Sequence, residues 1–585
     1  MGDLDGRTCQ HGPLQGVPGV HGPPVTVVTD TDTATATADA GKAASGKTSL
    51  LRSGALMAAG SIVSRATGFV RSAVITVALG TALLGDAYAV ANTVPNILYI
   101  LLIGGALNAV FVPELVRAAK EHEDGGAAYT DRLLTVCTAA LLVITAAAVL
   151  AAPLIVSAYT GYSGAQESTT VALARYCLPQ ILFYGLFTLL GQVLNARGRF
   201  GAMMWTPVLN NLVVIAVFGL FLYVSHGAGD GLTASETRLL GIGTTAGIVI
   251  QALGLVPSLR AARFRWRPRF DWRGSGLTRP LRNAGWLVML VLTNQLAYWV
   301  VTRLSTTTGR HAVDAGLAGG AGYVAYSNAY LLWMVPQGII TVSLVTALMP
   351  RMSAAATNGD LAGVRRDVSY ALRSSAALIV PAAAVFAALA PWVIGSVFEH
   401  GGDLDAADVA VMAGMLAAFA PGLIAYSAQY VLSRGFYALS DTRTPFFLNL
   451  VIAALNAGLS AAAYLLLPPR WAVTGMAAAC SIAFTAGAAA AAYVLARRLG
   501  PRAGTRTERR NTAVRTHLRL LIACAPAAAA GYGAARAVDR FGNFAGVAAG
   551  TAAILLVVVL LAGPLRLTEI TDLLDSARRR AGRKN

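Results

Sequence analysis

The amino-acid sequence predicts an all-α polytopic membrane protein with about 14 transmembrane helices, and three observations support this fold class. Apolar residues make up 56% of the 585-residue chain and charged residues only 13%, against about 25% charged residues in soluble domains. Long apolar segments follow one another from residue 54 onward, and basic residues gather in every second loop between them. This composition excludes a soluble enzyme, a disordered scaffold and a coiled coil.

Residues 1–53 are rich in Gly, Pro, Thr and Ala and show no apolar periodicity, so we expect a disordered cytoplasmic tail. The tail has no basic segment followed by an apolar one, which argues against a cleaved signal peptide. Residues 41–48 read GKAASGKT and fit the pattern of a phosphate-binding loop. Such a loop needs a preceding strand and a parallel sheet. The sequence offers no α/β domain to supply them, so we do not expect nucleotide binding.

Fourteen apolar segments of helical length follow the tail, each close to the ~20 residues that cross ~30 Å of hydrocarbon. Their approximate ranges are 54–80, 86–112, 132–158, 171–194, 205–225, 238–258, 284–305, 320–349, 372–398, 407–432, 445–467, 471–496, 518–538 and 541–563. Residues 259–283 and 497–517 are predicted as basic cytoplasmic loops, and residues 564–585 as a basic cytoplasmic tail.

The distribution of basic residues predicts that both termini are cytoplasmic. If the first segment runs from inside to outside, the tail, every second loop and the C-terminus hold 37 of the 46 Lys and Arg residues. The external loops and their flanks hold seven. This asymmetry follows the positive-inside rule. We therefore attribute the net charge of +18 to cytoplasmic surfaces that face anionic phospholipid, and we expect no nucleic acid partner.

An internal repeat predicts two lobes of six helices each. Residues 194–212 resemble residues 432–450, and Pro207 matches Pro445 at an offset of 238 residues. We therefore expect an N-lobe at 54–258, a C-lobe at 284–496 and two further helices at 518–563. Because six helices return the chain to the same side of the membrane, the repeat is parallel. Transporters built from such repeats bind substrate between the lobes.

The clearest candidate site is a narrow polar face on the first helix. At about 100° per residue, its members fall within an arc of about 120°. They are Ser61, Ser64, Arg65, Gly68, Arg71 and Ser72. A charge near mid-membrane costs at least ~2.5–3.5 kcal/mol unless it faces a cavity or a partner. The guanidinium fork binds phosphate bidentately and stays charged, so we expect Arg65 and Arg71 to hold an anion. The alternative is a structural ion pair with Asp86.

Further polar residues are candidates for the lining of the same cavity. Those of the second helix are Asn92, Asn96 and Tyr99, which share one face. Those of the facing lobe are Asn294, Gln295 and Tyr330. Asn, Gln and Tyr side chains in membrane helices either line a cavity or bond one helix to another, and both interpretations stay open.

The sequence shows no sign of catalysis or of a bound metal. The five cysteines form no CxxC pair, and the seven histidines are scattered singly, which argues against a disulfide framework or a zinc site. No pair of carboxylates stands at the predicted membrane surface, as a polytopic transferase would need. We therefore expect a transporter without a cofactor rather than an enzyme.

Four segments of the chain resemble the MurJ (MviN) lipid II flippases, a family of the MOP exporter superfamily. They are SIVSRATGFVRSAVI at 61–75, GDAYAVANTVPNILYILLIGGALNAVFVPEL at 85–115, LNARGRFGAMMWTPVLNN at 194–211 and AYSNAYLLWMVPQGIITVSLVTALMPRMS at 325–353. The resemblance implies that the chain carries an undecaprenyl-diphosphate-linked disaccharide-pentapeptide, a peptidoglycan precursor. It would move from the inner to the outer leaflet of the bacterial cytoplasmic membrane.

The resemblance also implies which residues take part. The family's arginines in the first helix correspond to Arg65 and Arg71, and its aspartate in the second helix corresponds to Asp86. This sequence departs from the family at Tyr99 and Gly104, where an arginine and a glutamate are lost together. The implied cavity therefore keeps two cationic anchors.

On this reading we expect alternating access, with the diphosphate on the two arginines and the prenyl chain in lipid. Coupling to the membrane potential or to an ion, and contact with cell-wall synthesis and division proteins, stay open. The alternatives are a flippase for another polyprenyl-linked oligosaccharide, a drug exporter of the MOP superfamily, and a non-transporting scaffold of cell-wall synthesis. A drug exporter for cations needs buried acids, and a scaffold has no reason to bury two arginines.

Overall fold

The computed structural model describes residues 59–60, 63–80, 83–101, 115, 124, 126–197, 199, 201–225, 232–271, 285–317, 321–398, 406–500, 512–572 and 575. Every described residue belongs to one compact unit, Met57–Asn585. These residues form helices and connecting segments, with no strand among them. The predicted N-terminal tail, with its segment 41–48, lies outside the described residues.

The helices of this unit follow one another along the chain in two groups. The first group is a first helix at residues 63–79, then α2 (Leu83–Leu101), α4 (Ala127–Leu150), α5 (Ala152–Tyr159), α6 (Gly164–Cys177), α7 (Gln180–Ala196), α8 (Gly201–Val224), α9 (Ala234–Leu253) and α10 (Val256–Ala261). The second group is α12 (Gly285–Asp314), α13 (Tyr323–Pro336), the π turn η2 (Gln337–Thr341), α14 (Val342–Thr357), α15 (Leu361–Phe398), α16 (Ala406–Ala438), α17 (Arg443–Leu466), α18 (Pro469–Arg498), α20 (Ala513–Ala537), the short η3 (Asp539–Phe541) and α21 (Asn543–Ala562).

The all-α membrane fold is confirmed, while the number of spans stays a prediction. Among the described residues, eleven helices are long and apolar enough to cross a membrane. They correspond to eleven of the fourteen predicted segments. The other three predicted segments fall on the first helix, α2 and α12, which are not among those eleven.

Prolines explain two differences between the predicted and observed helices. The segment predicted at 132–158 is divided into α4 and α5, and Pro153 stands in the first turn of α5. The segment predicted at 320–349 runs through α13, η2 and α14 to Thr357, with Pro336 directly before the π turn. Proline removes the backbone donor that would bond the carbonyl four residues earlier. The helix ends at the first site and widens into a π turn at the second.

Buried apolar side chains form separate clusters in the two groups of helices. One cluster takes its members from residues 78–264. Two others take theirs from residues 301–570 and 345–499. Helix α12 packs on α2 and α5 as well as on α17 and α18, so it connects both groups. The predicted lobe boundaries and the parallel repeat stay predictions.

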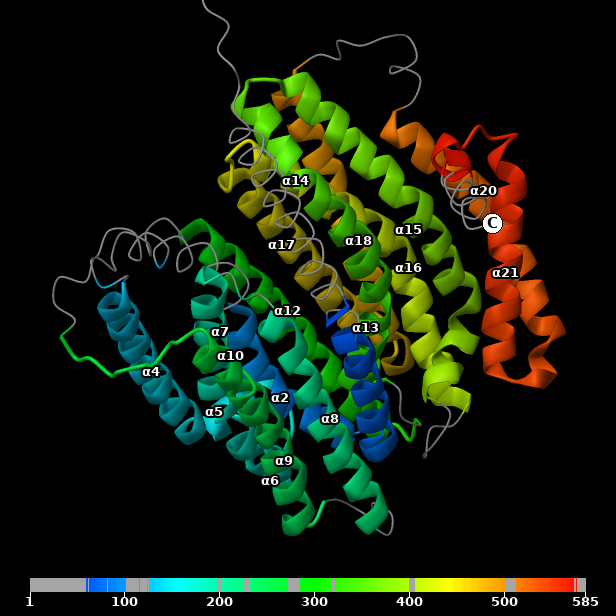
Figure 1. The fold of residues 1–585 in the computed structure, drawn as a ribbon. Helices are drawn as coiled ribbons and strands as arrows, with labels where there is room; N and C mark the ends of the chain where they lie inside the picture. The colour runs from blue at the N-terminus through cyan, green and yellow to red at the C-terminus, as the bar shows by residue number, and fades with distance from the viewer. Residues whose placement is uncertain are drawn as a thin grey trace, which may run out of the picture. The chain divides into compact units, whose positions relative to one another are not determined.

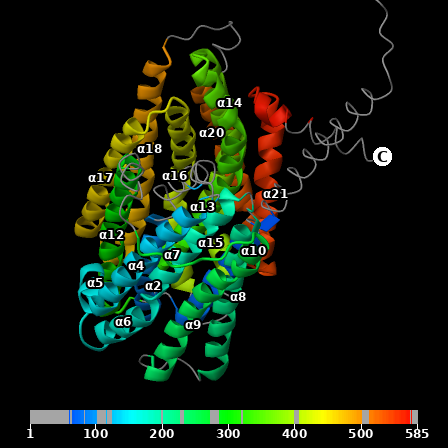
Figure 2. The same cartoon turned by 60° about the vertical axis from the view of Figure 1, so that its left-hand side comes forward.

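Neighbouring helices in the sequence pack in pairs. Helices α8 and α9 lie side by side, as do α20 and α21 (Figures 1 and 2). The pair α20 and α21 also packs against the long helix α15. This contact places the last two helices of the chain beside the second group.

The pair α17 and α18 depends on a glycine at its contact. A Cβ atom built at Gly487 in α18 would overlap the side chain of Ile452 in α17. Ile452 is 4% exposed and has no room to move away. Gly458, also in α17, has nothing within 4 Å of such an atom.

We expect Gly487→Ala to lower the stability of the protein by about 1–3 kcal/mol, because overpacking a close helix contact forces strain. The thermal unfolding midpoint of the purified protein in detergent measures this loss. Gly458→Ala is the matched control and should leave the midpoint unchanged or raise it slightly, since alanine favours helix. Equal midpoints for the two variants would contradict this account of the α17–α18 contact.

Candidate functional site

The first helix contributes to the cores of both groups of helices. Phe69 and Ala73 pack against the cluster of residues 301–570. Val74 and Ile75 pack against the cluster of residues 78–264. The helix therefore lies where the two groups meet.

The polar side of this helix is bonded to protein in both groups. Ser72 Oγ donates to Asn328 Oδ1 at 2.9 Å, and Asn328 Nδ2 donates to Thr76 Oγ1 at 2.7 Å. Asn211 of α8 donates from Nδ2 to the carbonyl oxygen of Ser64 at 3.0 Å. Hydroxyl groups and a backbone carbonyl of the first helix thus bond to α8 on one side and to α13 on the other.

Arg65 reaches from the first helix to the π turn of the second group. A Cβ atom built at Gly338 in η2 would overlap the guanidinium of Arg65, with Cζ at 3.1 Å. The guanidinium of Arg65 therefore occupies space that a side chain at residue 338 would fill. Arg65 itself is exposed, so its charge faces open space beside the π turn.

Arg71 lies two turns further along, on the side of the first group. It is half-buried and close enough to Tyr88 and Tyr184 to interact with them electrostatically. Its Nε atom is buried and has no hydrogen-bond partner among the described residues. Neither Arg65 nor Arg71 has a described carboxylate within 4 Å, as the ion pairs of the described residues involve other arginines.

Asp86 bonds to the N-terminus of α13 instead of to an arginine. Its Oδ1 accepts the backbone N–H of Val324 at 2.7 Å, and its Oδ2 accepts that of Tyr323 at 3.1 Å. The residue is 1% exposed. The first amides of a helix lack partners within the helix and carry its positive dipole end, so they stabilise the carboxylate. The ion pair with Asp86 that was the alternative for Arg65 and Arg71 is not observed, and contact between Asp86 and substrate stays a prediction.

The remaining candidates of α2 divide into a packing residue and an exposed one. Asn92 donates from Nδ2 to the carbonyl oxygen of Tyr88 at 3.1 Å and accepts from Gln180 of α7 at 3.2 Å. Asn96 is exposed. The side chain of Tyr99 lies outside the described residues. Asn92 therefore bonds helices within the first group, which was one of its two interpretations.

The three candidates of the second group lie in different surroundings. Asn294 is exposed and accepts from Asn449 of α17 at 2.9 Å. Gln295, the next residue of α12, is half-buried. Tyr330 stacks on Tyr326 and packs edge-on against Phe419 in an aromatic cluster. Their contact with substrate stays a prediction.

Side chains of α12 join the two groups at one end of the helices. We name this end, with residues 83–86, 157–163 and 321–324, the closed end. Four α12 side chains at helical spacing donate to backbone carbonyl oxygens there. The pairs are Trp299 with Ala158 at 3.0 Å, Arg303 with Ser157 at 2.9 Å, Thr306 with Tyr159 at 3.2 Å, and Arg310 with Gly161.

A chain of hydroxyl groups adds to this closure. The Tyr323 hydroxyl bonds to Thr93 Oγ1 of α2 at 3.1 Å and to the Tyr298 hydroxyl of α12. Among the described residues, the hydrogen bonds between the two groups lie at the closed end or in the adjacent part of the helices.

The sequence analysis missed several of these residues. The polar face of α12 was visible, because Trp299, Arg303, Thr306 and Arg310 recur at intervals of three or four residues. Gly338 gave no signal, because its role depends on a π turn that apolar periodicity does not predict.

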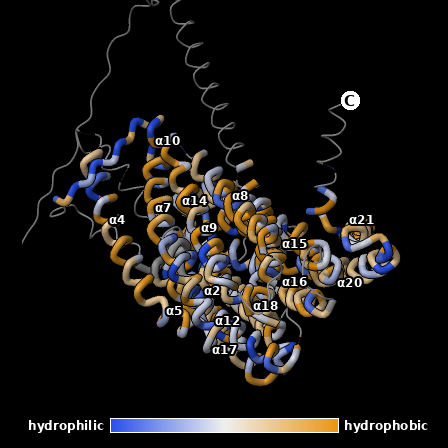
Figure 3. Tube along the Cα trace, turned by 90° about the horizontal axis from the view of Figure 1, so that it is seen from below, coloured by the Kyte–Doolittle hydropathy of each residue, from blue (hydrophilic) through white to orange (hydrophobic). Residues whose placement is uncertain are grey.

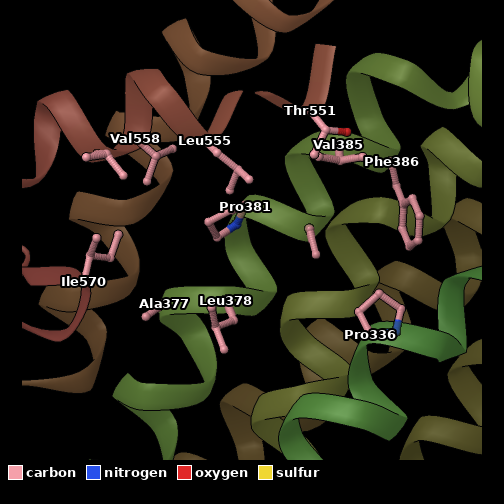
Figure 4. Close-up of a pocket in the computed structure, with 12 residues that line it drawn as sticks. Pro336, Ala377, Leu378, Pro381, Val385, Phe386, Thr551, Leu555, Val558 and Ile570 are labelled. Carbon is pink, nitrogen blue, oxygen red and sulfur yellow. The ribbon is translucent and has the colours of Figure 1, made fainter. Parts of the chain in front are cut away.

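An apolar pocket opens between α15, α21 and the Pro336 turn (Figure 4). Its volume is about 460 Å³. The residues that line it include Pro381, Val385 and Phe386 of α15 and Leu555 and Val558 of α21. Pro336 directly precedes the π turn that holds Gly338, so the pocket and Arg65 approach the same turn.

Comparisons with known sequences agree with the resemblance. A family model described as "Lipid II flippase MurJ" matches residues 75–547. Arg65 and Arg71 precede that range. The probable lipid II flippase MurJ of Rhizobium meliloti (strain 1021) is 26% identical over 437 residues, which cover 74% of this chain and 78% of the relative.

Two solved structures share the fold. One is described as lipid II flippase MurJ in an inward closed conformation; it is 17% identical, covers 87% of this chain and 99% of its own, and gives a TM-score of 0.68. The other is described as an inward-facing conformation of a MATE family multidrug resistance transporter of the MOP superfamily. It is 15% identical, covers 74% of this chain and 94% of its own, and gives a TM-score of 0.60.

We expect Asp86→Asn to destabilise the protein by about 1–3 kcal/mol, because a buried charge-assisted bond to the α13 amides is lost. Thermal unfolding in detergent measures the effect. The control is Asp314→Asn, the same chemical change at an exposed residue near the end of α12, which should not alter the midpoint. An Asp86→Asn midpoint equal to that of the wild type would show that the carboxylate does not hold α13.

Proposed function

The chain belongs to the lipid II flippase MurJ family, and we propose that it carries an undecaprenyl-diphosphate-linked peptidoglycan precursor from the inner to the outer leaflet by alternating access. On this assignment the protein is a polytopic membrane transporter. The proposal includes the site: the diphosphate binds Arg65 and Arg71, and the sugars and peptide occupy the space between the two groups of helices.

One observation carries the site proposal. Arg65 and Arg71 stand on a helix between the two groups, and neither has a described carboxylate within 4 Å. An unpaired charge at membrane depth is costly unless water or a ligand meets it. A diphosphate offers two anionic groups, and guanidinium forks bind such groups bidentately. Two arginines about two turns apart on one helix suit two linked phosphates.

The closed end supports alternating access. The positive-inside distribution predicts that this end faces away from the cytoplasm. With the closed end sealed by α12 and Asp86, substrate would enter from the cytoplasmic side. Breaking the bonds of Asp86 and α12 would then open the outer side. Moving a dianion outward is favoured by an inside-negative potential, by ~2.3 kcal/mol per charge per 100 mV.

The apolar pocket suits the lipid part of the substrate. It is lined by side chains of α15 and α21 and reaches Pro336 beside the π turn. A prenyl chain in this pocket would run from the lipid toward Arg65, because Gly338 follows Pro336 by two residues. The diphosphate would then lie between the two groups of helices while the prenyl chain of the substrate stays in apolar surroundings.

Other functions are less well supported by the same residues. A drug exporter for cations needs a free buried acid, and Asp86 is occupied by two α13 amides. A scaffold gives no role to Arg65 and Arg71. Localisation in the bacterial cytoplasmic membrane with cytoplasmic termini, and contact with cell-wall synthesis and division proteins, belong to the proposal.

We expect Arg65→Ala and Arg71→Ala each to reduce precursor export about 30-fold or more, because a charge contact with the diphosphate is lost. The measurement is the precursor left on the cytoplasmic leaflet after depletion of the wild-type protein and expression of the variant. Lysine should restore activity only in part, since it lacks the fork. Arg238→Ala, an exposed arginine of α9, is the control. Normal export by both alanine variants at wild-type membrane levels would refute the site.

We expect Gly338→Ala to reduce export by displacing the Arg65 guanidinium, whereas Gly458→Ala should not. A double-variant cycle separates this effect from general damage. In an Arg65→Lys background the added methyl group should cost less than in the wild type, because the slender lysine avoids the clash. An equal cost in both backgrounds would mean that Gly338 does not act through Arg65.

A further inference from the structure

The segment after α10 has a regular alternation of arginine with aromatic residues and proline. Residues 263–271, which we name the basic strap, read RFRWRPRFD. Phe264 is 7% exposed and Trp266 is half-buried. The arginines that alternate with these aromatic residues and Pro268 are exposed; they are Arg263, Arg265, Arg267 and Arg269. Figure 3 shows this hydrophilic stretch leaving α10 and running toward α4.

Backbone and side-chain bonds fix the strap against the first three turns of α4. The backbone N–H of Arg267 donates to Asp131 Oδ1 at 3.3 Å, and that of Arg269 donates to Thr135 Oγ1 at 3.0 Å. Trp266 Nε1 also donates to Thr135 Oγ1, at 3.4 Å. Arg267 and Arg269 are thus held through their main chain, which leaves their side chains available.

Both ends of the strap are anchored as well. At its start, Arg197 donates to the carbonyl oxygen of Ala262 at 2.9 Å and lies 4.8 Å from the centroid of the Phe264 ring. At its end, Asp271 accepts from Arg132 Nε at 3.0 Å. A segment held at both ends presents its outward side chains in a fixed row.

Nearby acids do not neutralise this row. Asp271 is paired with Arg132 and also interacts electrostatically with Arg269. Asp131 is buried and interacts electrostatically with Arg267 and Arg269, but it is a single carboxylate. Among the described residues, no carboxylate oxygen lies within 4 Å of the guanidinium nitrogens of the four strap arginines, since the observed ion pairs involve other residues.

We propose that the basic strap binds the phosphate headgroups of anionic phospholipids. The strap lies where α4, a helix long and apolar enough to cross the membrane, begins. That position places it at the level of the headgroups. Phe270 beside Arg269 is 69% exposed, and an aromatic residue next to arginine suits the membrane interface. Exposed guanidinium groups at this level meet the negative surface of the cytoplasmic leaflet.

The inference does not depend on what the protein transports. An acidic protein or a nucleic acid could also meet a row of arginines. Membrane lipid is favoured because the row is fixed at the start of a spanning helix, where lipid headgroups are always present.

The test uses the full-length protein in vesicles of phosphatidylcholine with increasing phosphatidylglycerol. One of the two lipids carries bromine, which quenches tryptophan fluorescence. The signal of Trp266 is the difference between the wild type and Trp266→Phe. Stronger quenching by brominated phosphatidylglycerol than by brominated phosphatidylcholine, weakened by salt, is the expected result.

The decisive variant is Arg265→Gln/Arg267→Gln/Arg269→Gln, which keeps the backbone bonds to Asp131 and Thr135. The preference for phosphatidylglycerol should fall about fivefold for each arginine removed. The matched control Arg470→Gln/Arg536→Gln/Arg540→Gln removes the same charge from exposed arginines elsewhere and should keep the preference.

Three results would overturn the proposal. They are equal quenching by the two brominated lipids, an unchanged preference in the strap variant, and loss of the preference in the control variant. Displacement of phosphatidylglycerol by millimolar inorganic diphosphate would assign the strap to a soluble anion instead.

Discussion

The core of a bilayer supplies no water to solvate a charge, and this constraint explains the placement of the charged side chains at the site. Asp86 satisfies this constraint by accepting hydrogen bonds from two backbone amides of α13. Arg303 and Arg310 meet it by donating to backbone carbonyl oxygens. Arg65 and Arg71 have no such described partner. This contrast within one molecule, more than the presence of arginine itself, favours the proposed binding site over a structural contact.

Much of this arrangement could be predicted from the sequence, but the rest could not. Apolar length predicted the spanning helices, because each segment must cross the same thickness. The 100° period placed Arg65 and Arg71 within one arc of the first helix, whereas in the structure Arg65 lies against the π turn of the second group and Arg71 lies near Tyr88 and Tyr184 of the first. The partner of Asp86 was not predictable, because Tyr323 lies 237 residues away and offers a main-chain amide rather than a recognisable side chain. The π turn beside Arg65 was equally hidden, since a widened helix keeps the apolar pattern of a regular one.

The first helix and α12 give the two groups of helices a common boundary. The first helix packs into both cores, and α12 contacts α2 and α5 as well as α17 and α18. A substitution in one of these helices therefore alters the packing of both groups. The π turn places Gly338 against Arg65 of the first helix. Pro336, directly before that turn, lines the apolar pocket, so the guanidinium and the pocket adjoin the same turn.

The four α12 donors at the closed end all use main-chain carbonyl oxygens of residues 157–161 as acceptors. Every amino acid, proline included, retains that oxygen. The acceptor side of the closure can therefore drift in evolution without losing a bond, while the donor side cannot. Among natural variants, only the α12 donors of this closure should be conserved, while the acceptor residues vary. Methods that search for paired substitutions between the two groups of helices would therefore overlook it.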